Sequence, residues 1–186
     1  MALTELDDGV IIGYPDAPTT IDIFDEPICP PCSRFVTSST VDIERAVNAH
    51  KLAVRYHLLN FLDKNSASGD YSTRAVAASY CVAEAKGPKM YVNFYVDLFG
   101  ANFQPVEGGR TDRTDAELAH LAQRVGAPTS AVDCIQQGRL VSTAKTKASQ
   151  GKSTLTGLGT EVSTPQAFNG THKIDISAAG WVDTLG

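Results

Sequence analysis

The sequence has 186 residues, a usual size for one domain, and 42% of them are hydrophobic, which is enough for a buried core. Its 21 acidic and 16 basic residues give a net charge of -5, and the basic residues neither form a block nor alternate with aromatic ones. These features argue against nucleic acid and acidic membrane surfaces as partners.

The cysteines, rather than the N-terminus, indicate the compartment. Two of the four cysteines lie close together, and the other two lie far apart at positions 81 and 134. One reactive pair plus two distant partners suits an oxidising compartment. Residues 1–5 lack the basic and apolar regions of an export signal, and no apolar run is long enough to span a bilayer. We therefore expect an extracytoplasmic protein, in the cell envelope, periplasm-like or secreted, whose signal or membrane anchor is absent from this sequence.

Two strands are predicted first. Residues 10–12 form a short apolar run before a turn bracketed by two prolines, which predicts an edge strand. Residues 19–24 are β-branched and alternate in polarity, which predicts a central strand. Asp22 lies in this strand, seven residues before Cys29. If buried near the cysteines it is a candidate proton relay; otherwise it is a solvated carboxylate at the strand end.

The central strand runs into the motif Cys29-Pro30-Pro31-Cys32. At a helix start, unpaired backbone N–H groups and the positive end of the helix dipole favour the thiolate of the first cysteine. Cys29 is therefore the candidate nucleophile, and Cys32 the thiol that resolves the mixed disulfide. The alternative is half of a structural zinc site, which needs a second Cys/His pair at short spacing. The other cysteines are isolated and the histidines scattered, so we expect no metal and no cofactor.

A helix and a second strand are predicted after the motif. Apolar positions 35, 36, 43 and 47 indicate the helix, and we expect a break at residues 37–40 (Thr-Ser-Ser-Thr), because hydroxyl side chains compete for backbone hydrogen bonds. Residues 52–58 alternate as a strand, and the intervening helix makes the two strands a parallel βαβ unit. We interpret His57 as a strand-face residue rather than a general base.

Residues 63–151 show helical periods without a convincing strand, which predicts an insertion of about five helices. A helix over residues 73–86 stops at Gly87-Pro88. Thr114 and Glu117 form a capping box for a later helix. Between the helix at residues 73–86 and this capping box, four residues at helical spacing form a stripe. We interpret the stripe as core rather than as a cofactor site: Tyr91, Phe94, Tyr95 and Leu98.

Cys81 and Cys134 fall within two of the predicted helices. A bond between them would close a loop of about 54 residues and stabilise the fold by about 4 kcal/mol on the chain-entropy model. Two free buried thiols are the alternative. We expect the disulfide in an exported protein.

The last third returns to strands. Thr164-Pro165 precedes a predicted hairpin, residues 166–168 and 171–174, whose Asn169-Gly170 turn is typical of tight hairpins. A cis bond before Pro165 would leave the backbone of Thr164 free to pair with an incoming peptide. Trp181 is expected to open a closing helix.

The whole pattern resembles the DsbA-like branch of the thioredoxin superfamily. The resemblance is carried by Cys-Pro-x-Cys at a helix start, the entry segment at residues 13–18 (Gly-Tyr-Pro-Asp-Ala-Pro), the helical insertion, and Thr-Pro before a hairpin. It implies an α/β thioredoxin fold, with a mixed central sheet flanked by helices and an inserted all-helical subdomain. We expect residues 1–62 and 152–186 to form the thioredoxin core and residues 63–151 the insertion.

The resemblance also implies an activity. A DsbA-like protein is expected to be a thiol-disulfide oxidoreductase, here a monomeric dithiol oxidase that passes the Cys29-Cys32 disulfide to unfolded exported proteins. A membrane reoxidase of the DsbB or VKOR type would accept the electrons. Thr164 and Pro165 would face the thiols and shape the substrate-binding side. A reductase or isomerase of the same fold, or a non-catalytic binding module with a structural cysteine pair, are the alternatives.

Two departures from the family pattern carry consequences. Pro31 stands where DsbA has histidine, which removes both an imidazolium and a backbone N–H from the neighbourhood of the Cys29 sulfur. We therefore predict a Cys29 pKa of roughly 5 to 7, depressed less than in DsbA. The buried acid of the family lies six residues before the first cysteine, whereas Asp22 lies seven before.

Overall fold

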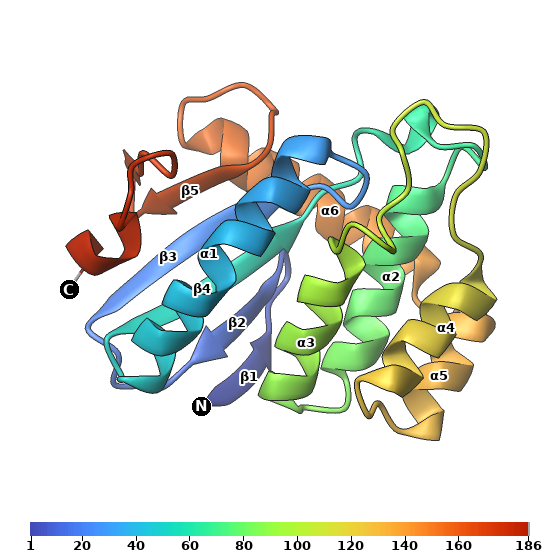
Figure 1. Ribbon diagram of the computed structural model, residues 1–186, viewed down its shortest axis with the longest axis horizontal. Helices are drawn as coiled ribbons and strands as arrows, with labels where there is room; N and C mark the ends of the chain where they lie inside the picture. The colour runs from blue at the N-terminus through green and yellow to red at the C-terminus, as the bar shows by residue number, and fades with distance from the viewer. Residues whose placement is uncertain (186) are drawn as a thin grey trace.

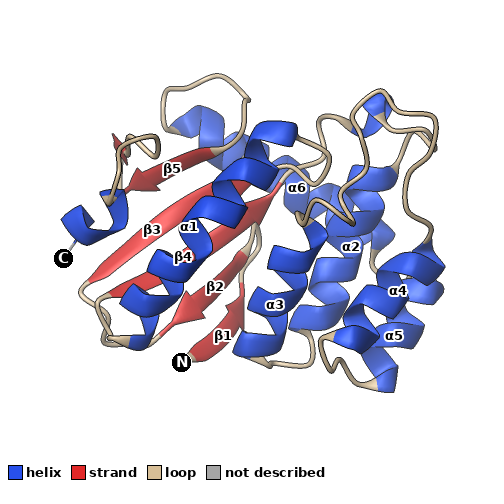
Figure 2. Ribbon diagram, viewed as in Figure 1, coloured by secondary structure: helices blue, strands red, loops and turns tan. Residues whose placement is uncertain are grey.

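A computed structural model of the protein describes residues 1–185, and its strands form one sheet in the order β1-β2-β4-β3-β5-β6 (Figures 1 and 2). The strands are β1 (Ala2–Glu5), β2 (Val10–Gly13), β3 (Thr19–Asp25), β4 (Leu52–Leu58), β5 (Gln166–Asn169) and β6 (His172–Lys173). Only β3 and β4 are parallel; the other neighbouring strands are antiparallel. The sheet is therefore mixed, as predicted.

The parallel pair β3 and β4 is joined by α1 (Pro30–Asn48), which confirms the predicted βαβ unit and the central position of residues 19–24. The prediction that residues 10–12 form an edge strand was wrong. β2 lies between β4 and β1, and β1 forms the edge. This first strand has only four residues, too few for a clear alternation in the sequence.

Helices cover both faces of the sheet. In Figure 1, α1 lies in front of the strands and α6 (Val141–Gly157) lies behind them. Successive side chains of β3 point to opposite faces of the sheet. Ile21 and Ile23 belong to the main core with α1, whereas Phe24 packs in a smaller cluster with Leu155 of α6.

The inserted helices follow a short 3-10 helix, η1 (Asp63–Asn65), and comprise α2 (Tyr71–Ala83), α3 (Pro88–Leu98), α4 (Asp115–Arg124), α5 (Thr129–Gln136) and α6. The helices α2 to α5 stand together beside the sheet, on the right of Figure 1, whereas α6 passes behind the strands. The Thr114–Glu117 capping box is present at the start of α4. The last helix, α6, ends at Gly157, six residues beyond residue 151, where we predicted the insertion to end.

The predicted break at residues 37–40 is wrong, because α1 runs without interruption. The hydroxyl groups of Ser38 and Thr40 donate to the carbonyls of Phe35 and Val36 inside the same helix. Ser39 is buried and accepts a hydrogen bond from the indole Nε1 of Trp181 at 3.4 Å. The hydroxyl groups therefore have partners that leave the backbone ladder intact.

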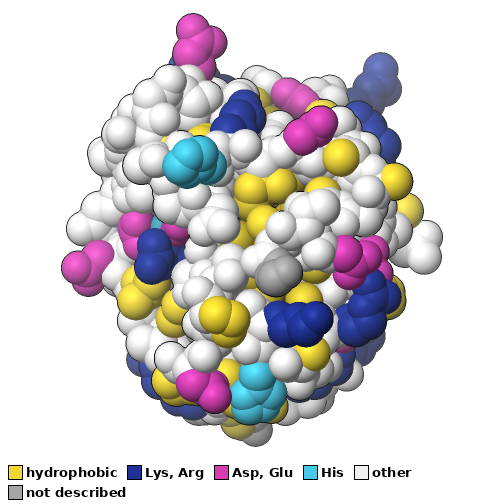
Figure 3. Space-filling model, turned by 90° about the vertical axis from the view of Figure 1, so that its left-hand side faces the viewer, with side chains coloured by type: hydrophobic (Ala, Val, Ile, Leu, Met, Phe, Trp, Pro, Cys, Tyr) yellow, Lys and Arg dark blue, Asp and Glu magenta, His cyan; other side chains and the backbone are white. Residues whose placement is uncertain are grey.

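Trp181 opens a 3-10 helix, η2 (Trp181–Leu185), rather than a longer closing helix. Figure 3 shows the face on the side of β5 and the C-terminal end, where acidic, basic and apolar side chains are interspersed. Within residues 1–185, no helix has both the length and the apolar character required to cross a membrane. The expected fold class, a mixed sheet flanked by helices with an all-helical insertion, is confirmed.

Candidate active site

The cysteine motif lies where β3 gives way to α1. Cys29 is the N-cap of α1, and Pro30 occupies its first position, where the missing N–H of proline costs nothing. Pro31 also lacks an N–H, so the first amide of the helix is that of Cys32, which donates to the Cys29 carbonyl at 3.1 Å. Both cysteines are free thiols; Cys29 is 5% exposed and Cys32 is fully buried.

The two thiols have opposite acidities. The pKa of Cys29 is lowered from 9.0 to about 6, mainly by a hydrogen bond from the Cys32 thiol and further by the Thr164 side chain, against the opposing effect of burial. Burial raises the pKa of Cys32 far above its ordinary value, and its bond to Cys29 raises it further. Cys29 is therefore the more acidic thiol of the pair, and its pKa falls in the range predicted from the sequence.

Thr164 and Pro165 lie against the nucleophile. The peptide bond between them is cis, and the Cys29 sulfur is 3.5 Å from the Thr164 carbonyl oxygen. These two residues precede β5, which pairs with β3, so the sheet places them beside the cysteines.

The structure does not place Asp22 beside the cysteines. Its carboxylate accepts hydrogen bonds from Arg55 at 2.9 Å and from His57 Nε2 at 2.8 Å. Asp22 shares its side of β3 with Phe24, which stacks on His57. Successive side chains of a strand point to opposite faces, so Asp22 faces away from the side that carries the cysteine pair. The proton-relay hypothesis for Asp22 is therefore wrong.

Asp25 is the carboxyl group beside the dithiol, and sequence reasoning missed it. It ends β3 on the same side as Ile21 and Ile23 and is 1% exposed. Burial raises its pKa from 3.8 to about 7, although hydrogen bonds to Tyr95 and Cys32 act in the opposite direction. The period of two along β3 contained the necessary signal, because it puts position 25, not position 22, on the cysteine side.

Glu26 is a second buried acid that the sequence analysis did not single out. Its side chain accepts the Ile28 N–H at 2.8 Å, and its backbone carbonyl accepts the Cys29 N–H at 3.0 Å, so it shapes the turn that leads to the nucleophile. Burial raises its pKa from 4.5 to about 8, against a hydrogen bond from Ser72 of α2. Glu26 is therefore largely protonated at neutral pH.

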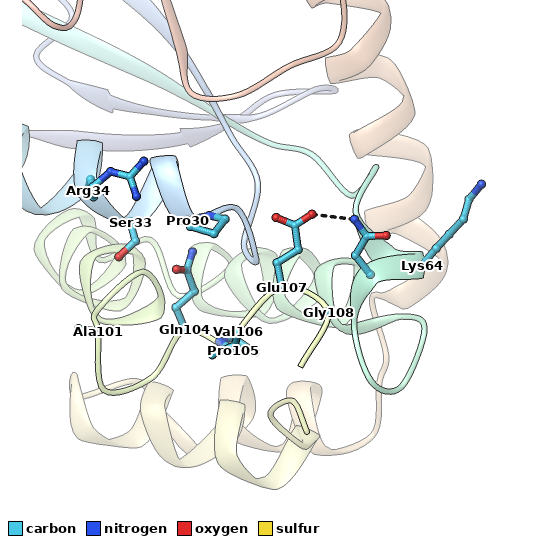
Figure 4. Close-up of a pocket in the computed structure, with 11 residues that line it drawn as sticks. Pro30, Ser33, Arg34, Lys64, Ala101, Gln104, Pro105, Val106, Glu107 and Gly108 are labelled. Atoms are coloured by element: carbon cyan, nitrogen blue, oxygen red, sulfur yellow. Dashed lines mark hydrogen bonds between the residues drawn. The ribbon is translucent and has the colours of Figure 1, made fainter. Parts of the chain in front are cut away.

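An open groove of about 840 Å³ lies beside the start of α1 (Figure 4). Its wall is the loop that follows α3, where Gln104 donates to the carbonyl oxygens of Pro27 at 3.2 Å and Cys29 at 3.0 Å. The groove is lined by apolar, polar and charged side chains, among them Pro30, Arg34, Lys64, Gln104, Val106 and Glu107. Val106 is 75% exposed, which is unusual for an apolar residue.

The remaining cysteines are bonded to each other. Cys81 of α2 and Cys134 of α5 form a disulfide with a Cα–Cα distance of 5.8 Å, so the predicted pairing is present. Both residues are buried in the helical insertion. Among residues 1–185, no three His, Cys, Asp or Glu side chains gather in a metal-binding arrangement.

The fold and the cysteine pair define a protein of the thioredoxin class. The family model described as thioredoxin matches residues 5–182, and the chain belongs to this family. Among solved structures, it resembles MdbA of Corynebacterium matruchotii, described as a thiol-disulfide oxidoreductase, with a TM-score of 0.87 and 24% identity over 100% of this chain and 91% of that one. DsbA of Mycobacterium tuberculosis gives a TM-score of 0.77 and 21% identity, over 96% and 97% of the two chains. At these identities the likeness concerns the fold.

A curated relative is more similar in sequence. Serine/threonine-protein kinase PknE of Mycobacterium tuberculosis (strain H37Rv) is 54% identical over 183 residues, which are 98% of this chain and 32% of PknE. PknE of Mycobacterium bovis matches to the same extent. The chain thus spans about a third of the length of these relatives.

Proposed function

We propose that this chain is a thiol-disulfide oxidoreductase, and specifically a dithiol oxidase that introduces disulfides into unfolded exported proteins. The observation that carries the proposal is the division of labour between Cys29, whose pKa is lowered to about 6, and the buried Cys32, whose pKa is raised. A pair of this kind separates the sulfur that exchanges with a partner from the sulfur that resolves the exchange.

The proposed reaction moves two electrons. A substrate thiolate attacks the Cys29 sulfur of the Cys29-Cys32 disulfide, and Cys32 leaves with a proton from Asp25. A second substrate thiolate then attacks the substrate sulfur of the mixed disulfide, which releases the Cys29 thiolate and a substrate disulfide. Asp25 suits both the donation and the reverse step, because its pKa of about 7 lets both protonation states exist at neutral pH.

The substrate would contact two surfaces close to Cys29. Thr164 and Pro165 lie next to its sulfur and offer backbone for pairing, and the groove is lined by Pro30, the residue after Cys29, and by Val106. We propose an extracytoplasmic location and reoxidation by a membrane partner of the DsbB or VKOR type, which would take the two electrons that the substrate leaves on Cys29 and Cys32.

Single-cysteine variants test the activity. The oxidised protein should convert a reduced two-cysteine peptide to its disulfide, with loss of a free thiol signal, and Cys29→Ser should abolish this conversion. Cys32→Ser, mixed instead with the disulfide form of the same peptide, should accumulate a mixed disulfide visible by mass spectrometry, because Cys29 attacks the peptide disulfide and the resolving sulfur is missing. Full turnover by Cys29→Ser, or no turnover of the peptide by the wild type, would refute the proposal.

The direction of the reaction is a separate measurement. A reductase or isomerase would use the same two sulfurs, so turnover alone does not distinguish it. Equilibration of the protein with glutathione buffers gives the reduction potential of the Cys29-Cys32 couple. An oxidase should have a potential well above that of thioredoxin, whereas a potential near about -270 mV would favour a reductase.

A redox sensor is the second candidate function, favoured by the 54% identity to kinases named PknE over 98% of this chain. In this role the dithiol would report the state of its surroundings to a kinase and would need no protein substrate. Rapid, reversible oxidation of Cys29 and Cys32 by small disulfides, without turnover of any protein or peptide dithiol, would favour the sensor over the oxidase.

A further inference from the structure

Tyr95 connects the helical insertion to the buried acid of the site. Its hydroxyl group, carried by α3, donates a hydrogen bond to Asp25 Oδ2, and both residues are buried. The Cys32 thiol is the second hydrogen-bonding partner of this carboxyl group. The Tyr95 ring is held between Tyr56 and Phe99, with ring centroids at 4.7 Å and 5.1 Å, so the direction of its hydroxyl is fixed by packing.

Tyr95 and the Cys32 thiol both form hydrogen bonds with the Asp25 carboxyl group, and Cys32 stops donating once it gives up its proton, so the ionised carboxylate depends on Tyr95. Removing a carboxylate from water disfavours ionisation, and a hydrogen bond to the ionised form restores part of the loss. The ionisable groups that face Asp25 are Cys29 and Cys32 of α1, Tyr95 of α3 and Tyr56 of β4. Of these, the two tyrosines stay neutral at neutral pH and the Cys29 thiolate opposes a second negative charge.

We propose that Tyr95 is a positioning residue for the Cys32 half of the reaction: its hydroxyl group holds Asp25 in the orientation and ionised form that accept the Cys32 proton. The inference rests on the proposed function and gives a task to a residue that helical spacing alone assigns to the core. It also gives the insertion a direct part in the chemistry of the thioredoxin core.

The step can be isolated with the aromatic disulfide dithiobisnitrobenzoate and the reduced protein. The Cys29 thiolate attacks the reagent, forms a mixed disulfide and releases one thionitrobenzoate. The Cys32 thiol then gives its proton to Asp25, its sulfur bonds to the Cys29 sulfur, and a second thionitrobenzoate leaves. The protein is oxidised by two electrons and the reagent is reduced, so the two coloured releases report Cys29 and Cys32 separately.

Tyr95→Phe should change only the second release. We expect the pH of its half-maximal rate to rise by about one unit or more, which corresponds to a tenfold loss in the ionisation of Asp25, while the pH profile of the first release stays unchanged. Tyr91→Phe is the matched control: it removes the hydroxyl of a neighbouring buried tyrosine on α3 and should shift neither phase. A second release with the same pH profile in Tyr95→Phe and wild type would overturn the inference.

A double variant separates the proposed role of Tyr95 from a general loss of stability. In an Asp25→Asn background, Tyr95→Phe should add no further change to the second release, because the carboxyl group on which it acts is gone. A comparable further slowing in that background would show a purely structural role and refute the proposal. Failure of the proposed function would instead appear as absent turnover of peptide dithiols by a wild type that still reacts with the aromatic disulfide in two phases.

Discussion

Cys29 and Cys32 lie one helical turn apart, yet their sulfur atoms have opposite surroundings. Cys29 caps the helix and has the Cys32 thiol and Thr164 as hydrogen-bonding partners. Cys32 lies one turn into the helix, inside the core, where burial penalises its thiolate. The order of the residues along the chain therefore decides which of the two thiols is the more acidic.

Glu107 lines the groove, and its negative charge acts to raise the pKa of Cys29. Glu107→Gln removes this charge but keeps an oxygen that can accept the Asn65 hydrogen bond, now 2.7 Å long. We expect the pKa of Cys29 to fall by a few tenths of a unit at low salt and by less at high salt, because Glu107 is partly exposed and its effect is screened. Titration of the thiolate absorbance measures this.

The matched control for Glu107 is Glu84→Gln, which removes a surface carboxylate paired with Arg139 in the helical insertion. It should leave the pKa of Cys29 unchanged. A rise in the Cys29 pKa of Glu107→Gln, or an equal fall in both variants, would contradict the assignment of Glu107.

Sequence reasoning singled out the cysteine pair and Thr164-Pro165, which the structure brings together, because each is marked by local chemistry: a Cys-x-x-Cys spacing and a proline heading a strand. It chose the wrong carboxylate. Asp22 was selected for its distance along the chain from Cys29, whereas the face of the strand decides which carboxyl group meets the thiols, and that face belongs to Asp25.

At the scale of elements, α1 shows why local propensity misleads. The run of four hydroxyl residues at 37–40 predicts a break, but the buried Ser39 has a partner in Trp181, 142 residues away. A contact of that separation cannot be derived from a local pattern. The five inserted helices were predictable because their periods and the Thr114–Glu117 capping box are local signals.

Glu26, in the turn between β3 and α1, makes the stability of the protein depend on pH. Its pKa is about 8 in the folded protein and 4.5 in the unfolded reference. Between these values the folded state holds one more proton than the unfolded state, so the free energy of unfolding decreases as pH rises. The contribution of Glu26 is complete below about pH 4.5 and is lost by about pH 8. Asp25 acts in the same direction between 3.8 and about 7.

Glu26→Gln should therefore flatten this decrease. The slope of unfolding free energy against pH should be smaller by up to about 1.4 kcal/mol per pH unit in the window of Glu26, because one titrating proton is removed. Urea unfolding of the reduced protein at a series of pH values measures the slope. Glu84→Gln again serves as the exposed comparison, and a Glu26→Gln slope equal to that of wild type would count against the raised pKa.

At the scale of the whole molecule, the insertion completes the site rather than merely covering it. Tyr95 from α3 and Gln104 and Glu107 from the following loop all contact or face the β3–α1 turn. We predicted a division of the chain at residues 62 and 151, but the contacts that build the site cross that division. The sequence could not reveal this, because the residues involved lie about 70 positions from the turn they serve.

The Cys81–Cys134 disulfide ties α2 to α5 within that insertion, with a sequence separation of 53 residues. A Cys81→Ala/Cys134→Ala variant should lose about 4 kcal/mol of unfolding free energy on the chain-entropy model, because its unfolded chain is no longer constrained by the loop. The pKa of Cys29 should stay the same, since no group of α2 or α5 is among those that shift it. Urea unfolding gives the first quantity and thiolate titration the second.

Wild type unfolded in the presence of a strong reductant is the control for lost packing, because it loses the bond without losing the sulfur atoms. A variant as stable as the oxidised wild type would show that the bond is dispensable, and a shifted Cys29 pKa would show that the insertion's internal packing reaches the nucleophile.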